Sequence, residues 1–96
     1  MSDLSPTAVG ARLSILRAAK AIPSQAEMAR LIGVELKRYN HWERGRGMLP
    51  VEQAVEICRV TGANLDYIYL GEMSALPMNL VTLLAEQSPA IKGLLG

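Results

Sequence analysis

The sequence predicts an all-α fold: a compact domain of five helices over residues 1–71, followed by an apolar, helical C-terminal extension over residues 72–96. Three observations lead to this prediction. Apolar residues recur at helical spacing, helix caps and glycine or proline breaks are frequent, and the alternating pattern of a strand is almost absent. Half of the 96 residues are hydrophobic, which is enough for the core of one small domain.

The first helix is predicted from Pro6 to about Ala21. Ser5 is a favourable N-cap, and proline suits the first helical position because its missing N–H would have no partner there. Ile22-Pro23 ends this helix, since proline disfavours helical geometry in the residue before it.

The second helix is predicted from Gln25 to Ile32. Ser24 and Glu27 have the spacing of a capping box, in which each side chain bonds the other residue's backbone amide. Gly33 then ends the helix in a left-handed conformation.

Three further helices are expected over residues 35–44, 50–61 and 64–70. Pro50 opens the second of these, and Asn64 caps the third. A glycine follows each helix and ends it: Gly45, Gly62 and Gly71.

Charge is distributed unevenly, although the net charge is only +1. Residues 12–46 contain eight basic and three acidic residues, a net charge of +5, and the rest of the chain carries −4. Such asymmetry suggests that one region faces a polyanion. The alternative is an ordinary solvated surface that happens to be uneven.

Several classes of function find no support. Cys58 is the only cysteine, which rules out an intramolecular disulfide and suits a reducing cytosol. No stretch resembles a secretory leader or a membrane-spanning helix. One histidine and one cysteine provide neither a nucleophile–base pair nor a zinc site. We therefore expect a cytoplasmic protein that is not an enzyme and has no cofactor or metal.

The third predicted helix has two distinct faces at 100° per residue. One face holds Leu36, Tyr39, Trp42 and Glu43. The opposite face holds Lys37, His41 and Arg44, flanked by Arg38 and Asn40. A face of donors and cations without a carboxylate suits the major groove of DNA, where bases offer mainly acceptors between rims of phosphate. A solvated polar face is the alternative.

Residues 24–45 contain a more specific pattern. Ser24-Gln25-Ala26-Glu27-Met28-Ala29, then Ile32-Gly33, then Tyr39 and Trp42-Glu43-Arg44-Gly45, resembles the phage-repressor and Cro-type helix-turn-helix family, also called XRE-like. Residues 62–71 resemble the closing helix of that family, so the similarity covers roughly residues 9–71.

The resemblance implies a repressor-like helix-turn-helix domain that binds DNA. It implies base contacts from Leu36, Lys37, Asn40 and His41. It implies phosphate contacts from Gln25, Arg38, Arg44 and Arg46. It also implies that Glu43 pairs with an arginine of the first helix, either Arg17 or Arg12.

The sequence departs from the family at three places. Ile22-Pro23 replaces the usual Gly-Leu turn, which reshapes the first helix junction. Trp42 is larger than the aliphatic residue usual there. Leu36 stands where polar base-reading residues are frequent, so it contacts a thymine methyl group or belongs to the core.

These expectations combine into a regulator that represses transcription as a homodimer on an inverted-repeat operator in double-stranded DNA. The apolar C-terminal third, residues 64–96, is the expected dimer contact, since a two-fold axis needs an apolar patch away from the basic region. Alternatively, Leu80, Leu83 and Leu84 fold back as an extra helix on their own domain. A second alternative for the whole chain is an antitoxin-like protein-interaction module on the same fold, with a toxin or another regulator as partner.

Overall fold

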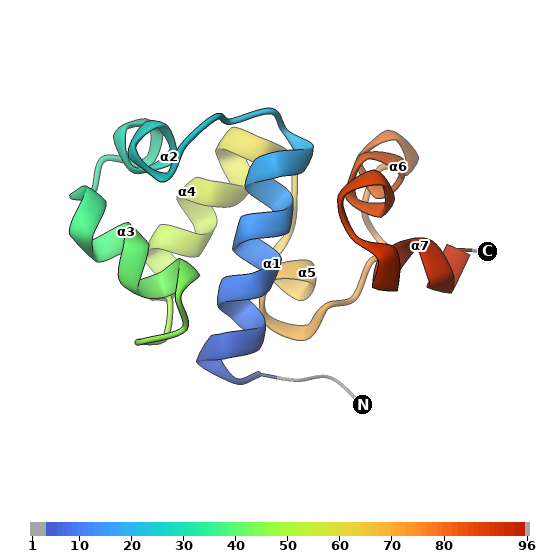
Figure 1. The fold of residues 1–96 in the computed structure, drawn as a ribbon, viewed down its shortest axis with the longest axis horizontal. Helices are drawn as coiled ribbons and strands as arrows, with labels where there is room; N and C mark the ends of the chain where they lie inside the picture. Colours follow the sequence, from blue (N-terminus) through green and yellow to red (C-terminus); the bar gives the residue numbers. More distant parts are fainter. Residues whose placement is uncertain (1–3, 96) are drawn as a thin grey trace.

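The computed structural model describes residues 4–95, and helix is the only regular secondary structure among them. In chain order the helices are α1 (Pro6–Ala19), α2 (Gln25–Ile32), α3 (Leu36–Glu43), α4 (Val51–Thr61), α5 (Leu65–Leu70), α6 (Met78–Gln87) and α7 (Pro89–Leu95) (Figure 1). This confirms the predicted all-α class, and the C-terminal extension consists of the two helices α6 and α7.

Caps in the sequence set most of the helix ends. At the starts of α1, α2 and α5, a side-chain oxygen accepts the backbone amide three residues later, from Ser5, Ser24 and Asn64 respectively. The glycines that follow α2, α4 and α5 all have positive φ. The capping box at α2 is only half formed, because both carboxylate oxygens of Glu27 bond Arg30 instead of returning to the Ser24 amide.

The end of α1 differs from the prediction. The helix ends at Ala19, two residues early, and Ala21 has φ 56°, a left-handed conformation that is uncommon for alanine. The chain turns here because Ile22 returns to α1: its amide bonds the Arg17 carbonyl, and its own carbonyl accepts a bond from the Arg17 guanidinium. The turn before Ile22-Pro23 therefore begins inside the predicted helix.

Helix α1 is packed against α3, α5 and α6. Its Gly10 lies against the C-terminal end of α3, where an added Cβ would be 2.5 Å from the carbonyl oxygens of both Trp42 and Glu43. Only a residue without a side chain permits so close an approach. The single core around α1 contains buried side chains from six helices, including Val9, Leu13, Leu16, Met28, Ala29, Tyr39, Trp42, Ala54, Ile57, Tyr67, Ile68, Leu80 and Leu84.

Helix α6 folds back onto α1. Leu80 and Leu84 are buried and Leu83 is half-buried against the same core. Of the two fates considered for this apolar segment, packing on its own domain is therefore the one observed for α6. The side chains of Leu94 and Leu95 lie outside the described part of the chain.

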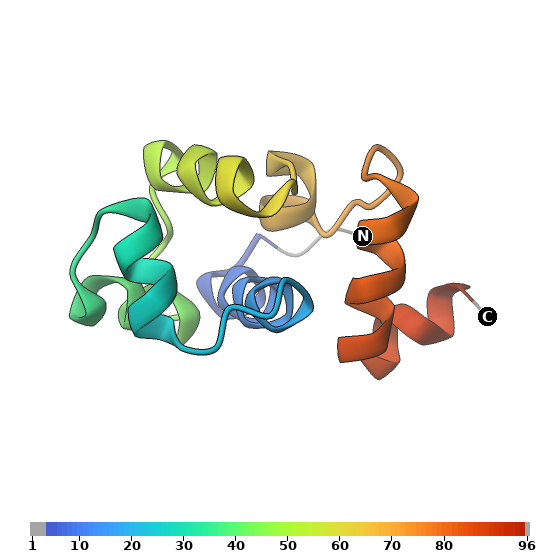
Figure 2. The ribbon, with the colours of Figure 1, turned by 90° about the horizontal axis from the view of Figure 1, so that it is seen from above.

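The chain is elongated, with principal extents of 37 × 26 × 20 Å. Both ribbon views place α2 and α3 at one end of the long axis and α6 and α7 at the other, with α1, α4 and α5 between them (Figures 1 and 2). The helix with the basic face is thus far from the C-terminal helices.

Candidate nucleic-acid interface

Helices α2 and α3 form a helix-turn-helix pair. Gly33, with φ 75°, ends α2, and the Val34 amide closes the turn on the Ala29 carbonyl. Three residues, 33–35, then lead directly into α3. Ala29 is buried, which allows the two helices to pack closely.

The buried face of α3 consists of Tyr39 and Trp42, as predicted, with exposed fractions of 0% and 5%. Their rings meet edge to face at 6.3 Å, and the Arg38 guanidinium lies 5.2 Å above the Trp42 ring. The prediction that Leu36 shares this face is wrong: Leu36 is 49% exposed, because it opens α3 before the helix reaches the core. Of its two interpretations, the core is therefore excluded.

The basic residues of segment 12–46 fall into two groups. Three are engaged inside the chain: Arg12 bonds the carbonyls of Ile68 and Tyr69, Arg17 pairs with Glu43, and Arg30 pairs with Glu27. The other five are exposed and make no ion pair within residues 4–95: Lys20, Lys37, Arg38, Arg44 and Arg46. Four of these five belong to α3 and the residues just after it, together with exposed His41.

A largely buried ion pair joins α1 to the end of α3, beneath the exposed cations. The Arg17 Nε donates to Glu43 Oε2 at 2.9 Å and its Nη2 donates to Oε1 at 3.2 Å. Arg17 is thus the partner of Glu43, whereas Arg12 covers the C-terminal carbonyls of α5. Burial works to raise the pKa of Glu43, but hydrogen bonds, foremost from Arg17, lower it below its ordinary value. Glu43 is therefore a carboxylate at neutral pH.

Tyr39 lies beside this ion pair. Its hydroxyl is buried and has no partner at hydrogen-bond geometry among the described residues. Burial, followed by the nearby Glu43 carboxylate, raises the pKa of Tyr39 far above its ordinary value. The phenol thus stays neutral and contributes to the core rather than to the charge of the surface.

The structure joins two of the predicted DNA contacts to each other. The Asn40 Nδ2 donates to Gln25 Oε1 at 2.7 Å, and the Gln25 Nε2 donates to Glu43 Oε1 at 3.0 Å. Sequence reasoning missed this network. The available signal was the three-residue spacing of Asn40 and Glu43, which places both on the side of α3 that faces the start of α2.

The other residues predicted to contact DNA are exposed to solvent on α3 or just after it. Leu36, Lys37, Arg38 and His41 are exposed along α3, Arg44 caps its end, and Arg46 is exposed in the turn that follows. Gln25 and Asn40 are half-buried. The structure therefore gathers all eight predicted residues around α3, and their contacts with DNA stay predictions.

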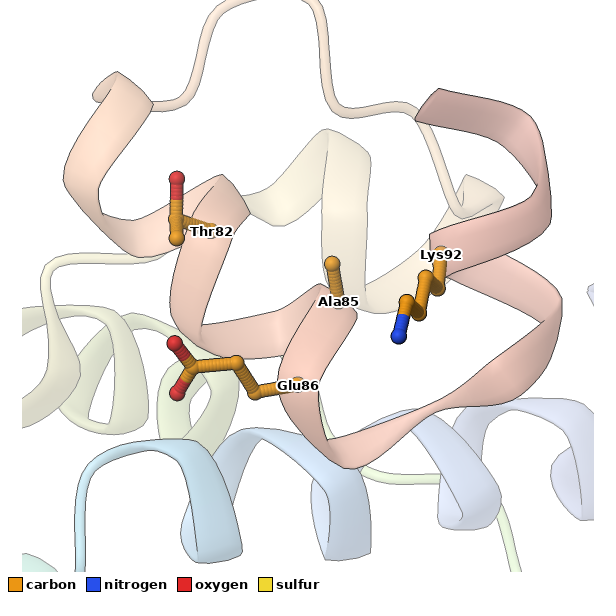
Figure 3. A pocket seen from close by; sticks show the side chains of 4 residues that line it. All are labelled: Thr82, Ala85, Glu86 and Lys92. Carbon is orange, nitrogen blue, oxygen red and sulfur yellow. The ribbon is translucent and has the colours of Figure 1, made fainter. Parts of the chain in front are cut away.

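A shallow pocket of about 390 Å³ lies elsewhere, between α6 and α7 (Figure 3). Its lining consists of Thr82, Ala85, Glu86 and Lys92. The pocket is at the far end of the long axis from α3 and belongs to a separate surface.

None of the helices in the described part of the chain has the length and hydrophobicity of a membrane span.

The comparisons with known proteins agree with this geometry. The sequence pattern of the Helix-turn-helix family matches residues 16–68, more than half of the chain, from the end of α1 into α5. The chain matches no curated protein and no solved structure. The family match confirms the resemblance found in residues 24–45 and in residues 62–68 of the closing segment. The chain belongs to the helix-turn-helix family of phage-repressor and Cro type (XRE-like), a family of DNA-binding transcription regulators.

Proposed function

We propose that this regulator binds double-stranded DNA sequence-specifically, with α3 in the major groove, and represses transcription as a homodimer on an inverted-repeat operator. The observation that carries the proposal is the exposed surface of α3 and of the residues just after it, where Lys37, Arg38, Arg44 and Arg46 have no ion partner among residues 4–95. Cations gathered on one surface in this way gain most from phosphates, because binding releases condensed counterions from DNA. Repression needs only occupancy of the operator, and the proposed location is the cytoplasm.

The contacts divide by position. Lys37 lies near the start of α3, where base edges come closest, and suits guanine acceptors. Exposed Leu36 suits a thymine methyl group, and Asn40 suits adenine. Arg44 and Arg46 lie at the exit of the helix, where a phosphate rim would pass.

Selection of bound fragments from random DNA tests this function, and the expected result is an inverted repeat. A salt titration on the selected site then measures the phosphate contacts. With Arg38, Arg44 and Arg46 on phosphates, log K should fall with log salt at a slope of about −3 per subunit. Binding without salt dependence, or no enrichment of any sequence, would contradict the proposal.

Matched charge removals sharpen the titration. Arg46→Ala should weaken binding to all sequences alike and reduce the slope by about one ion. Lys92→Ala removes one exposed cation from α7 at the opposite end and should leave the slope unchanged. Equal effects of the two variants would point to net charge alone rather than to a DNA surface at α3.

The homodimer is proposed because one helix-turn-helix unit reads only a few base pairs, and two half-sites supply useful affinity. Within residues 64–96, Leu80 and Leu84 are buried in their own core. Among residues 64–93, whose side chains the structure describes, the exposed large apolar side chains are Leu65 and Met78, at 37% and 73%. Deleting the segment would also strip α6 from α1, so point changes are the cleaner test.

The experiment compares Leu65→Asp and Met78→Asp by sedimentation at micromolar concentration. Conversion of either variant to a monomer that keeps its helical content supports the contact. If both variants remain dimeric, the contact proposed through Leu65 and Met78 is wrong.

The alternative is an antitoxin-like interaction module on the same fold. Its support is Val51 and Val55, which lie one turn apart on α4 and are 57% and 40% exposed. Weak binding to DNA that does not change with salt, together with a stable complex with a protein partner, would favour this function over DNA binding.

A further inference from the structure

We propose that Gln25 is a positioning residue: a directed hydrogen-bond chain from Glu43 through Gln25 fixes the Asn40 amide so that Asn40 accepts adenine and rejects guanine. This inference rests on the proposed DNA-binding function and names the base that one side chain selects.

The ion pair between Arg17 and Glu43 sets the direction of these hydrogen bonds. Glu43 Oε1 receives the Arg17 Nη2 at 3.2 Å and the Gln25 Nε2 at 3.0 Å, and Oε2 receives the Arg17 Nε. The Glu43 side chain is only 4% exposed and its pKa is lowered, so it stays ionised. An ionised carboxylate has no donor. Gln25 must therefore turn its NH₂ group toward Glu43.

The two polar groups of the Gln25 amide have opposite hydrogen-bonding roles. With its NH₂ group on Glu43, Gln25 directs its carbonyl oxygen toward Asn40. Two carbonyl oxygens at hydrogen-bond distance would repel, so Asn40 must answer with its own NH₂ group, and it does so at 2.7 Å. The charge on Glu43 thus sets the orientation of an amide on α3, although the carboxylate itself is shielded from solvent.

Asn40 retains part of its hydrogen-bonding capacity for DNA. One N–H is engaged by Gln25, which leaves the carbonyl oxygen and the second N–H of a half-buried side chain. In the major groove, adenine offers a donor at N6 beside an acceptor at N7, which matches this edge. Guanine offers acceptors at both O6 and N7, so its O6 would oppose the fixed carbonyl oxygen of Asn40. A freely rotating Asn40 amide could turn its NH₂ group to guanine. The hydrogen bonds from Asn40 to Gln25 and from Gln25 to Glu43 prevent that rotation.

Two simpler roles for Gln25 make different predictions. A phosphate contact, which the family resemblance implies, would affect all DNA sequences equally, and because glutamine is uncharged its loss would leave the salt slope unchanged. A purely structural link between α2 and α3 would lower stability and weaken every site together. Only a positioning role changes the preference at one base position and depends on Asn40.

The test uses the full chain and the selected operator. Asn40→Ala first identifies the base position at which preference disappears. The operator is then made with each of the other three bases at that position. Wild type should favour adenine over guanine there by roughly tenfold to a hundredfold, the range that a bidentate pair supplies. Gln25→Ala should bring this ratio close to one. The preference at the position lost in Lys37→Ala and the salt slope should both remain as in wild type.

A double-variant cycle isolates the coupling. In the Asn40→Ala background, Gln25→Ala should have no further effect on base preference if Gln25 acts through Asn40. The same fractional loss of affinity in both backgrounds and on all sequences would overturn the inference in favour of a phosphate or structural role. An unchanged adenine-to-guanine ratio in Gln25→Ala would also overturn it. In these outcomes wild type still binds DNA with a steep salt dependence, so the proposed function stands; wild type without such binding would overturn both.

Discussion

Replacing Gly10 by alanine measures how tightly α1 and α3 are held together. In the middle of an exposed helix, this change normally stabilises by about 1 kcal/mol, because alanine has the higher helix propensity. Gly10 is different because its missing Cβ faces the backbone of α3. The new methyl group would lie 2.5 Å from two carbonyl oxygens and 2.9 Å from the Glu43 carbonyl carbon.

Backbone atoms at that distance cannot move aside as a flexible side chain can, so the two helices must separate. Overpacking of this kind costs typically about 1–3 kcal/mol, and the steric conflict with backbone places Gly10→Ala at the upper end. After the gain in helix propensity, a net loss of about 2 kcal/mol is expected. For a domain of this size, that corresponds to a fall in Tm of about 8–16 °C.

The matched control is Gly93→Ala. Gly93 lies in α7 and an added Cβ there would meet no heavy atom within 4 Å. Urea and thermal unfolding, followed by circular dichroism, should show Gly93→Ala equal to or more stable than wild type. If Gly10→Ala behaved in the same way, the close approach of α1 and α3 would be refuted.

Four further outcomes are expected. Trp42→Ala should cost about 3–5 kcal/mol in urea unfolding, and a variant that folds normally but loses DNA binding would show that Trp42 is not a core residue. Since the pKa of Glu43 is lowered, the stability that its carboxylate contributes is fully present above the ordinary value of 4.5 and is lost as pH falls below it. Glu43→Gln should therefore flatten the decline of the urea midpoint below that pH. An unchanged decline would contradict the role of Glu43 as a stabilising carboxylate. Ala21→Gly should raise stability by about 0.5–1 kcal/mol in thermal unfolding, because glycine adopts φ 56° without strain, and a loss of stability would exclude that strain. Lys37→Ala should cost about 1–3 kcal/mol on the preferred operator and relax preference at one base position, whereas unchanged affinity and specificity would remove Lys37 from the base-reading set.

Most helix ends could be predicted because they depend on local chemistry. Ser24 and Gly33 specify the limits of α2 through bonds within a few residues, and the same holds for Asn64 and Gly71 at α5. The end of α1 could not be predicted in this way. It depends on the return of Ile22 to Arg17, and Arg17 is itself positioned by Glu43 from a distant part of the chain.

The candidate site was predictable in its composition but not in its internal bonds. Helical periodicity correctly separated buried Tyr39 and Trp42 from the exposed cations. It misplaced Leu36, because periodicity gives the direction of a side chain and not the point at which the core begins. The choice between Arg12 and Arg17 as partner of Glu43, and the link from Gln25 to Asn40, required the relative placement of three helices.

Because the protein is elongated, the distance between the two operator half-sites depends on which part of each subunit contacts the other. If two chains meet end to end through α6 and α7 with their long axes in line, their α3 helices lie apart by close to twice the 37 Å length of one chain. That separation suits half-sites about two helical turns apart, roughly 68 Å centre to centre. Contact along the side of the chain, through α4 and α5, brings the two α3 helices closer and suits half-sites one turn apart. The centre-to-centre distance in the selected inverted repeat therefore identifies which end or side of the protein faces its partner.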